Sequence, residues 1–324
     1  MDITNNIWYD HFLRSLNEKY PKKSQLTEAL MDLLLIEREA VYRRLRKEVI
    51  FSVYDMAKIA NAWNISIDSI FGIVSEESHL FQLDILPYND PILVDLEATK
   101  KYFHFLKTLT SSNNSEYIEI SRTLPQSLLE NHPMLSKFYM LKWMYQYGNE
   151  NNIPSFNQFI YPEKIIELAK EYCNYIRQIK HSSYTWDNLI IQYLINDILY
   201  FKSIYLLSEE DVQLLKQEIN TFLDDMEILS IQGEFAETRN KVDLYISQIN
   251  IETNYCYYFS PTIKVCGIGA FVKSTAISQN ESICKNFKKW IITQKKISIP
   301  ISQVNERQRI EFFKQQRCRL EKLS

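Results

Sequence analysis

Apolar residues recur at helical spacing over most of the chain and change to a strand-like alternation in one segment near the C-terminus. In the first quarter, apolar stripes separated by short polar breaks predict five helices, at about 5–19, 24–34, 37–47, 53–63 and 67–73. The irregular stretch that follows contains Pro87 and Pro91, which are typical of a linker. We therefore expect a helical domain at 1–78, a linker at 79–91 and a second domain at 92–324.

The second domain is predicted to be mainly helical. Amphipathic patterns predict helices at about 93–106, 134–147, 163–179, 186–206, 208–230, 281–296 and 304–322. Before the last two helices, Val242, Leu244 and Ile246 alternate with outward positions at the strand period of two, and two similar runs follow. This predicts a small antiparallel meander at about 241–273. The predicted fold class is mainly α: an N-terminal five-helix bundle, then a helical domain with one small sheet, an α+β arrangement.

The composition is that of a folded, water-soluble protein. Of the 324 residues, 46% are hydrophobic and 24% charged, and only five Gly and nine Pro occur, which argues against disordered stretches. The sequence contains neither an apolar run of about 18 residues nor a basic start before an apolar run, so we expect no membrane span and no secretory signal. The five cysteines are widely spaced without zinc-binding patterns, so we expect reduced, mostly buried thiols.

A short basic helix, Glu37–Lys47, is the most informative feature of the N-terminal domain. The preceding helix has an apolar face, a tight connection follows, and Val41 and Leu45 are the inward positions of the basic helix. A recognition helix that enters the major groove is built in this way, with side chains for base edges and flanking cations for phosphates. The side chains that we predict to contact DNA are Arg38, Glu39, Tyr42, Arg43, Arg44, Arg46 and Lys47.

The residues after the basic helix extend this pattern. Ser52 and Asp55 predict a variant of the capping box at the start of the next helix. Met56, Ile59 and Trp63 then give that helix a core face. The predicted unit is therefore a set of short helices that brackets the basic one.

The segment Leu26–Gly72 resembles the lambda-repressor-like (XRE-type) helix-turn-helix family, most closely the BetR-like variants of the recognition helix. The resemblance depends on Ala40–Arg46, Phe51–Ser52, Ile59–Ala60 and Ile65–Ile70. It implies a sequence-specific transcriptional regulator in the bacterial cytoplasm, with double-stranded DNA as partner and Glu37–Lys47 as the recognition helix. Two positions depart from the family: Leu35 stands where many relatives have Gly in the turn, and Glu37 where many have a Ser or Thr cap.

Two alternatives remain open for the basic segments. The N-terminal bundle can instead be a protein-interaction adaptor or antitoxin-like partner without specific DNA binding, an interpretation favoured by Glu37 and Glu39 beside the arginines. The segment from Glu281 to the end has eleven Lys/Arg against four Asp/Glu, a local excess of 11 − 4 = +7. The net charge of the whole chain is only −3, so this cluster is interpreted as surface solvation or a partner face.

The sequence does not point to an enzyme. The five histidines lie far apart without a metal-binding spacing, and no phosphate-binding loop occurs. Gly267 and Gly269 lack the third Gly and the acidic residue of a dinucleotide-binding fingerprint. We therefore predict no catalytic residue, no cofactor and no metal.

The C-terminal domain contains surplus apolar and aromatic surface. The aromatic run Tyr255–Phe259 is interpreted as packing against the terminal helices, with a ligand pocket for an unidentified effector or a dimer face as the alternative. The predicted helix at 186–206 is apolar around most of its circumference and must be covered on every side. Because one recognition helix contacts only a few base pairs, we expect this domain to form a homodimer.

Overall fold

The computed structural model describes residues 7–63, 65, 67, 81–83, 102–147, 153–270 and 274–323. The chain divides into two compact units, Met1–Leu80 and Phe81–Ser324, which are treated separately. Of the predicted linker at 79–91, residues 81–83 are described, and Gln82–Leu83 form strand β1; the rest lies outside the described residues. No helix within the described ranges is long and apolar enough to cross a membrane.

The N-terminal unit has four helices in its described residues. These are α1 (Ile7–Lys19), α2 (Lys23–Leu34), α3 (Arg38–Leu45) and α4 (Val53–Trp63). Their apolar faces enclose one core, with Phe12, Leu26 and Ile59 fully buried. The predicted five-helix bundle is wrong: four helices already close this core, and the segment expected for the fifth, 67–73, lies outside the described residues except for Ile67.

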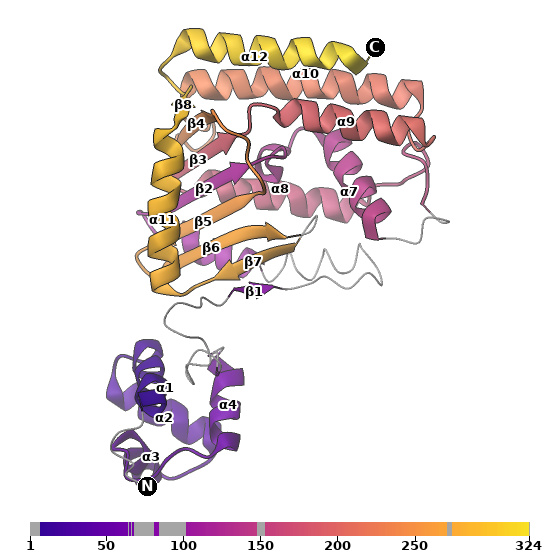
Figure 1. The fold of residues 1–324 in the computed structure, drawn as a ribbon. Helices are drawn as coiled ribbons and strands as arrows, with labels where there is room; N and C mark the ends of the chain where they lie inside the picture. The colour runs from indigo at the N-terminus through magenta and orange to yellow at the C-terminus, as the bar shows by residue number, and fades with distance from the viewer. Residues whose placement is uncertain are drawn as a thin grey trace. The chain divides into compact units, whose positions relative to one another are not determined.

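The C-terminal unit is built on an eight-stranded mixed sheet (Figure 1), ordered β1-β7-β6-β5-β2-β3-β4-β8. The strands besides β1 are β2 (Glu116–Ser121), β3 (His181–Trp186), β4 (Lys241–Ser247), β5 (Tyr255–Ser260), β6 (Ile263–Ala270), β7 (Ser274–Ser278) and β8 (Ser298–Pro300). The neighbours β2, β3 and β4 are parallel, whereas β5, β6 and β7 form antiparallel pairs. Both edge strands are very short, which limits edge-to-edge pairing.

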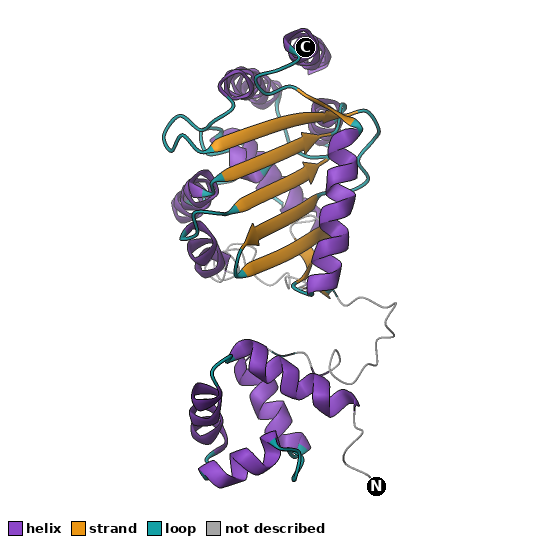
Figure 2. Ribbon diagram, turned by 90° about the vertical axis from the view of Figure 1, so that its left-hand side faces the viewer, coloured by secondary structure: helices purple, strands orange, loops and turns teal. Residues whose placement is uncertain are grey.

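Helices cover both faces of this sheet (Figures 1 and 2). The helices besides those of the first unit are α7 (Pro133–Tyr147), α8 (Glu163–Gln178), α9 (Ile190–Ser203), α10 (Glu209–Gln232), α11 (Glu281–Lys296) and α12 (Glu306–Leu320), and residues 102–110 are also helical. One face, with Tyr117 and Tyr184, packs in a single core with α7–α10 and α12. The opposite face, with Ile118 and Ile120, is covered by α11.

Two local interactions explain where long helices begin. Ser208 and Asp211 form a reciprocal capping box at the N-terminus of α10, where a helix was predicted to begin at about 208. Further along α10, the Glu218 carboxylate accepts hydrogen bonds from the Met134 and Leu135 N–H groups at the start of α7. A carboxylate there satisfies amides that have no partner within the helix.

The prediction of a mainly α chain with a small antiparallel meander is also wrong. The segment at 241–273 holds three of the eight strands of one large sheet, and β4 is parallel to β3 rather than paired with β5. The strands β2 and β3, which lie at the centre of the sheet, were not predicted. The helix expected at 186–206 begins only at Ile190, because Trp186 ends β3.

Candidate nucleic-acid interface

A three-residue turn joins α2 to α3. Leu35 ends α2 in the left-handed conformation, with φ 57° and ψ 45°, and its N–H donates to the Met31 carbonyl at 2.9 Å. Ile36 and Glu37 complete the turn, and α3 begins at Arg38. The Glu37 side chain makes no capping hydrogen bond, which fits the low capping tendency of Glu.

The inner face of α3 anchors it on α2. Val41 is fully buried, together with Leu26 and Leu30 of α2, and Leu45 is partly buried against the same core. With eight residues, α3 is too short to be stable alone, so this packing is what holds it. The outer face of α3 is thereby kept at a fixed orientation within the unit.

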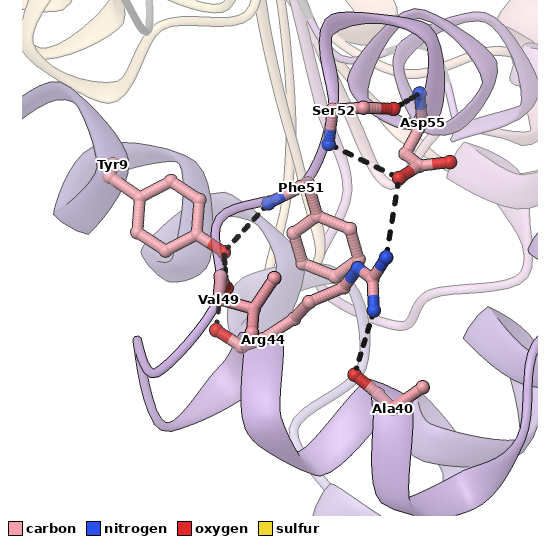
Figure 3. A network of polar contacts seen from close by, with 7 residues as sticks. All are labelled: Tyr9, Ala40, Arg44, Val49, Phe51, Ser52 and Asp55. Carbon is pink, nitrogen blue, oxygen red and sulfur yellow. Dashed lines mark hydrogen bonds and ion pairs between the residues drawn. The ribbon is translucent and has the colours of Figure 1, made fainter.

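The Arg44 side chain is mostly buried, with 20% of it exposed (Figure 3). One nitrogen of its guanidinium donates to the Ala40 carbonyl at 3.1 Å, and another lies 3.8 Å from an Asp55 carboxylate oxygen. The group also lies 5.7 Å from the centre of the Phe51 ring. Asp55 belongs to the predicted capping box, which is confirmed by the reciprocal bonds between Ser52 and Asp55 at 3.0 and 3.1 Å. Arg44 therefore links α3 to the start of α4.

Tyr9 of α1 connects the same region from the other side (Figure 3). Its hydroxyl lies 3.1 Å from the Arg44 carbonyl oxygen and accepts a hydrogen bond from the Phe51 N–H at 3.3 Å. Burial raises the pKa of this phenol to about 12, although the Phe51 hydrogen bond and the nearby Arg44 charge both act to lower it. The C-terminal end of α3 is thus fixed by α1 and α4 together.

The exposed face of α3 carries paired charges. Arg46 lies 2.8 Å from Glu39 and 3.0 Å from Glu48, and Arg43 lies 3.6 Å from the same Glu48. All of these side chains are about half exposed or more, so each pair contributes little to stability. Arg38 is exposed and forms no ion pair with any residue that the structure describes.

The predicted DNA-contacting residues therefore divide into three groups. Arg38, Glu39, Arg43 and Arg46 are exposed on the outer face of α3, and Tyr42 is partly exposed one turn from Arg38 and Arg46. Lys47 is partly buried at the end of α3 and pairs with Asp10 of α1. Arg44 belongs to the interior contacts described above.

Two acidic residues of this surface were missed by the sequence analysis. Glu48 pairs with two arginines of α3, and Asp10 pairs with Lys47. Glu48 directly follows the basic run, so its position was a usable signal. Asp10 lies more than thirty residues away along the chain, and only the packing of α1 against α3 brings it close.

A second polar cluster lies in the C-terminal unit, on the sheet face that packs against α7–α10. The Tyr117 hydroxyl donates to Glu119 of the same strand at 2.6 Å. Tyr258 of β5 stacks on Tyr117 with ring centres 4.8 Å apart, and its hydroxyl contacts that of Tyr102. Burial raises the pKa of Glu119 to about 7, against the opposite effect of hydrogen bonds from Tyr117 and Ser127. The cluster is a packed core feature around one carboxyl group.

The aromatic strand β5 uses its two faces differently. Tyr258 faces the cluster just described, whereas Tyr255 packs against Trp290 of α11 with ring centres 4.6 Å apart. Tyr257 lies in the α11 core, with the Lys288 ammonium 5.0 Å from its ring centre. These contacts are the packing against a terminal helix that was expected for Tyr255–Phe259.

The comparisons with known proteins give no assignment. No family model matches the chain, and neither a curated protein nor a solved structure shows significant similarity to it. Among the described residues, no three His, Cys, Asp or Glu side chains are grouped so that they could hold a metal ion. The exposed charges of α3 are therefore the main observation that bears on function.

Proposed function

We propose that the N-terminal unit binds double-stranded DNA, that α2 and α3 act as a helix-turn-helix, and that the chain is a transcriptional regulator of the bacterial cytoplasm. The observation that supports this most is the outer face of α3. It presents Arg38, Arg43 and Arg46 from a helix that is anchored by Val41 and braced by Arg44. A rigid, exposed helix with arginines at the start and along one face can meet both base edges and phosphates.

The net charge of the N-terminal unit implies that only the α3 surface, and not the whole unit, attracts DNA. Residues 1–80 contain ten Lys/Arg and twelve Asp/Glu, so the formal charge of the N-terminal unit is 10 − 12 = −2. Such a unit does not attract a polyanion over its whole surface. DNA phosphates would therefore have to replace Glu39 and Glu48 as partners of Arg43 and Arg46.

The test is the salt dependence of duplex binding by the full chain. We expect Arg43→Ala with Arg46→Ala to weaken binding at least tenfold and to lower the slope of log affinity against log salt by about two, because two phosphate contacts are lost. The matched control is Arg14→Ala with Lys19→Ala, which removes the same charge from exposed positions of α1. If both double variants lose affinity equally, α3 is not the reader.

The ion pairs on α3 favour a second candidate, a protein-interaction adaptor. If Glu39 and Glu48 serve to neutralise the arginines, the surface suits a mixed-charge protein partner better than DNA. The variant Glu39→Gln with Glu48→Gln distinguishes the two. If α3 reads DNA, the variant should bind duplex DNA more tightly, because Arg43 and Arg46 no longer have to leave Glu39 and Glu48 before they contact phosphates. If the unit is an adaptor, neither the parent chain nor the variant should bind DNA specifically.

DNA reading also bears on the oligomeric state. One α3 covers only a few base pairs, and two-fold pairing doubles the contacts at half-sites spaced about 34 Å apart. We therefore include a homodimer in the proposed function.

A further inference from the structure

The outer surface of α10 and α12 carries an apolar patch. The two helices lie side by side (Figure 1), and Arg317 of α12 joins Asp224 and Glu227 of α10 at 2.6 and 2.7 Å. Near the end where α10 finishes and α12 begins, four aliphatic side chains are each 51–54% exposed: Ile228, Ile231, Val304 and Ile310. We call these four residues the α10–α12 patch.

Two hydrogen bonds join the segment before α12 to the end of α10. The Gln303 N–H donates to the Ser230 carbonyl at 3.0 Å, and the Gln303 side chain donates to the Gln232 carbonyl at 2.8 Å. Val304, the next residue after Gln303, therefore follows a residue that is bonded to both neighbours of Ile231 in α10. Ile310 follows at the first turns of α12, on the flank that also carries Arg317, seven residues on.

The outermost stripe of α12 runs alongside the patch. Arg307, Glu311, Lys314 and Cys318 are all exposed and follow the spacing of four, three and four that places residues on one helix face. They line a shallow hollow together with Ile310. The stripe holds charges of both signs, in the order Arg307, Glu311, Lys314.

This order is self-complementary under two-fold symmetry. If α12 packs antiparallel against the α12 of a second copy, with the axis between Glu311 and Lys314, each Glu311 faces the Lys314 of the other copy. Arg307 then faces Cys318 of the other copy, because the midpoint between positions 307 and 318 is the same as the midpoint between 311 and 314. A two-fold contact uses the same surface twice, so both ion pairs form at once.

The apolar residues fit the same arrangement. The patch lies at one end of the α10–α12 pair, and Leu214, which is half exposed, lies at the other end of α10. In an antiparallel pair, the patch of one copy meets the Leu214 end of its mate, and the reverse. Burial of the apolar residues at both ends would stabilise the dimer, and the charge pairs between them would fix the register of the two helices.

We propose that the α10–α12 surface is the interface of a homodimer with antiparallel α12 helices. The choice of a second copy as the occupant rests on the proposed function, which needs two α3 helices, and on the charge order of α12. The exposed patch and the charge order of α12 are observed whether or not the chain binds DNA.

The first test is sedimentation of the full chain without DNA at micromolar concentration. We expect a dimer, and we expect Ile231→Glu with Ile310→Glu to weaken dimerisation at least tenfold, because two carboxylates would be buried in the apolar ends. The matched control is Ile160→Glu, which adds a carboxylate at another exposed isoleucine of the same unit and should leave the dimer intact. A monomeric parent chain, or equal dimerisation by the patch variant, overturns the proposal.

The second test fixes the helix arrangement. Arg307→Cys should form an intermolecular disulfide with Cys318 of the second copy under mild oxidation, and the covalent dimer should disappear when Cys318→Ser is added. The control is Gln308→Cys, which is exposed on a different side of α12 and should not cross-link. Equal cross-linking by both variants would show random collision and overturn the antiparallel contact.

The two proposals can fail separately. The α3 variant Arg43→Ala with Arg46→Ala should remain a dimer in sedimentation while losing DNA. The patch variant should become a monomer whose remaining affinity for a half-site still depends on α3. A dimer that never binds DNA overturns DNA binding and leaves the interface standing. A monomer that binds DNA overturns the homodimer and its interface and leaves DNA binding by α3 standing.

Discussion

Neighbouring arginines of α3 have opposite roles. The Arg43 side chain is about half exposed, and among the described residues its ion pair is with Glu48. Arg44 is mostly buried and joins Ala40, Asp55 and the Phe51 ring. The sequence already contained a signal for this difference. Val41, Arg44 and Leu45 share the spacing of one helix face, so Arg44 lies on the inward side. We grouped it with the exposed arginines because its residue type is usually solvated.

This difference predicts different effects on stability. Arg44→Ala should lower the free energy of unfolding of the N-terminal unit by about 1–3 kcal/mol, because it leaves Asp55 and the Ala40 carbonyl without this partner. Arg43→Ala should change it by less than about 0.5 kcal/mol, as exposed substitutions usually do. Chemical denaturation followed by circular dichroism measures both. Equal effects of the two substitutions would contradict the interior role of Arg44.

Glu119 predicts a pH dependence in the C-terminal unit. Burial raises its pKa from the ordinary 4.5 to about 7, so between these values the folded state holds a proton that the unfolded state has released. Stability should therefore fall as pH rises from 4.5 to 7 and then level off for this group. Glu119→Gln keeps an acceptor for Tyr117 but cannot ionise, so it should remove that fall and raise stability at pH 8.

Urea unfolding at pH 5 and pH 8 checks this expectation. Glu167→Gln, on the exposed side of α8, serves as the control and should leave the pH dependence as it is in the parent chain. A Glu119→Gln variant that still loses stability over this range would show that another group is responsible.

At the scale of elements, the α2–α3 turn contains an unfavourable conformation. Leu35 adopts φ 57°, where a side chain other than Gly costs about 1–2 kcal/mol, and it is 84% exposed. Leu35→Gly should therefore raise the melting temperature of the N-terminal unit. The net gain in the free energy of unfolding should be up to about 1 kcal/mol, because Gly also increases the conformational entropy of the unfolded chain. Leu35→Ala keeps the Cβ atom and should bring no such gain. Calorimetry that finds Gly less stable than Ala would disprove the strain.

Amphipathic helices were predictable from the sequence, and the central strands were not. The helices α7, α8 and α10–α12 begin within two residues of the expected positions, because each has one apolar face and polar punctuation. β3 is buried on both faces and consists of His181–Trp186, with Ser182, Ser183 and Thr185 among its residues. Parallel strands between two helical layers need no alternation, and these small polar residues are typical of a break between helices.

The meander was predicted wrongly because local patterns do not show which strands pair. Alternation at Val242–Ile246 correctly indicated a strand, but the partners of a strand depend on distant segments. β4 pairs with β3, about sixty residues earlier, and with β8, about fifty residues later. Local periodicity contains no information about such pairing, whereas the α2–α3 connection is short enough to be deduced from adjacent residues.

At the scale of the whole molecule, two sets of residues form separate cores. Among the residues that the structure describes, the core of the N-terminal unit, with Leu30, shares no member with the two cores of the C-terminal unit, one of which contains Ile195. Each set is large enough to support its own cooperative transition. The two units therefore need not unfold together.

This separation predicts two independent unfolding transitions in the full chain. Leu30→Ala and Ile195→Ala each remove a fully buried side chain and should each cost about 2–5 kcal/mol. Because the two substitutions lie in cores that are formed by different residues, Leu30→Ala should lower the melting temperature of one calorimetric transition and leave the other in place, and Ile195→Ala should do the reverse. The fragment 1–80 should then melt at the temperature of the first transition and respond to Leu30→Ala by the same amount. A single transition that both substitutions shift would show that the two cores fold as one cooperative unit.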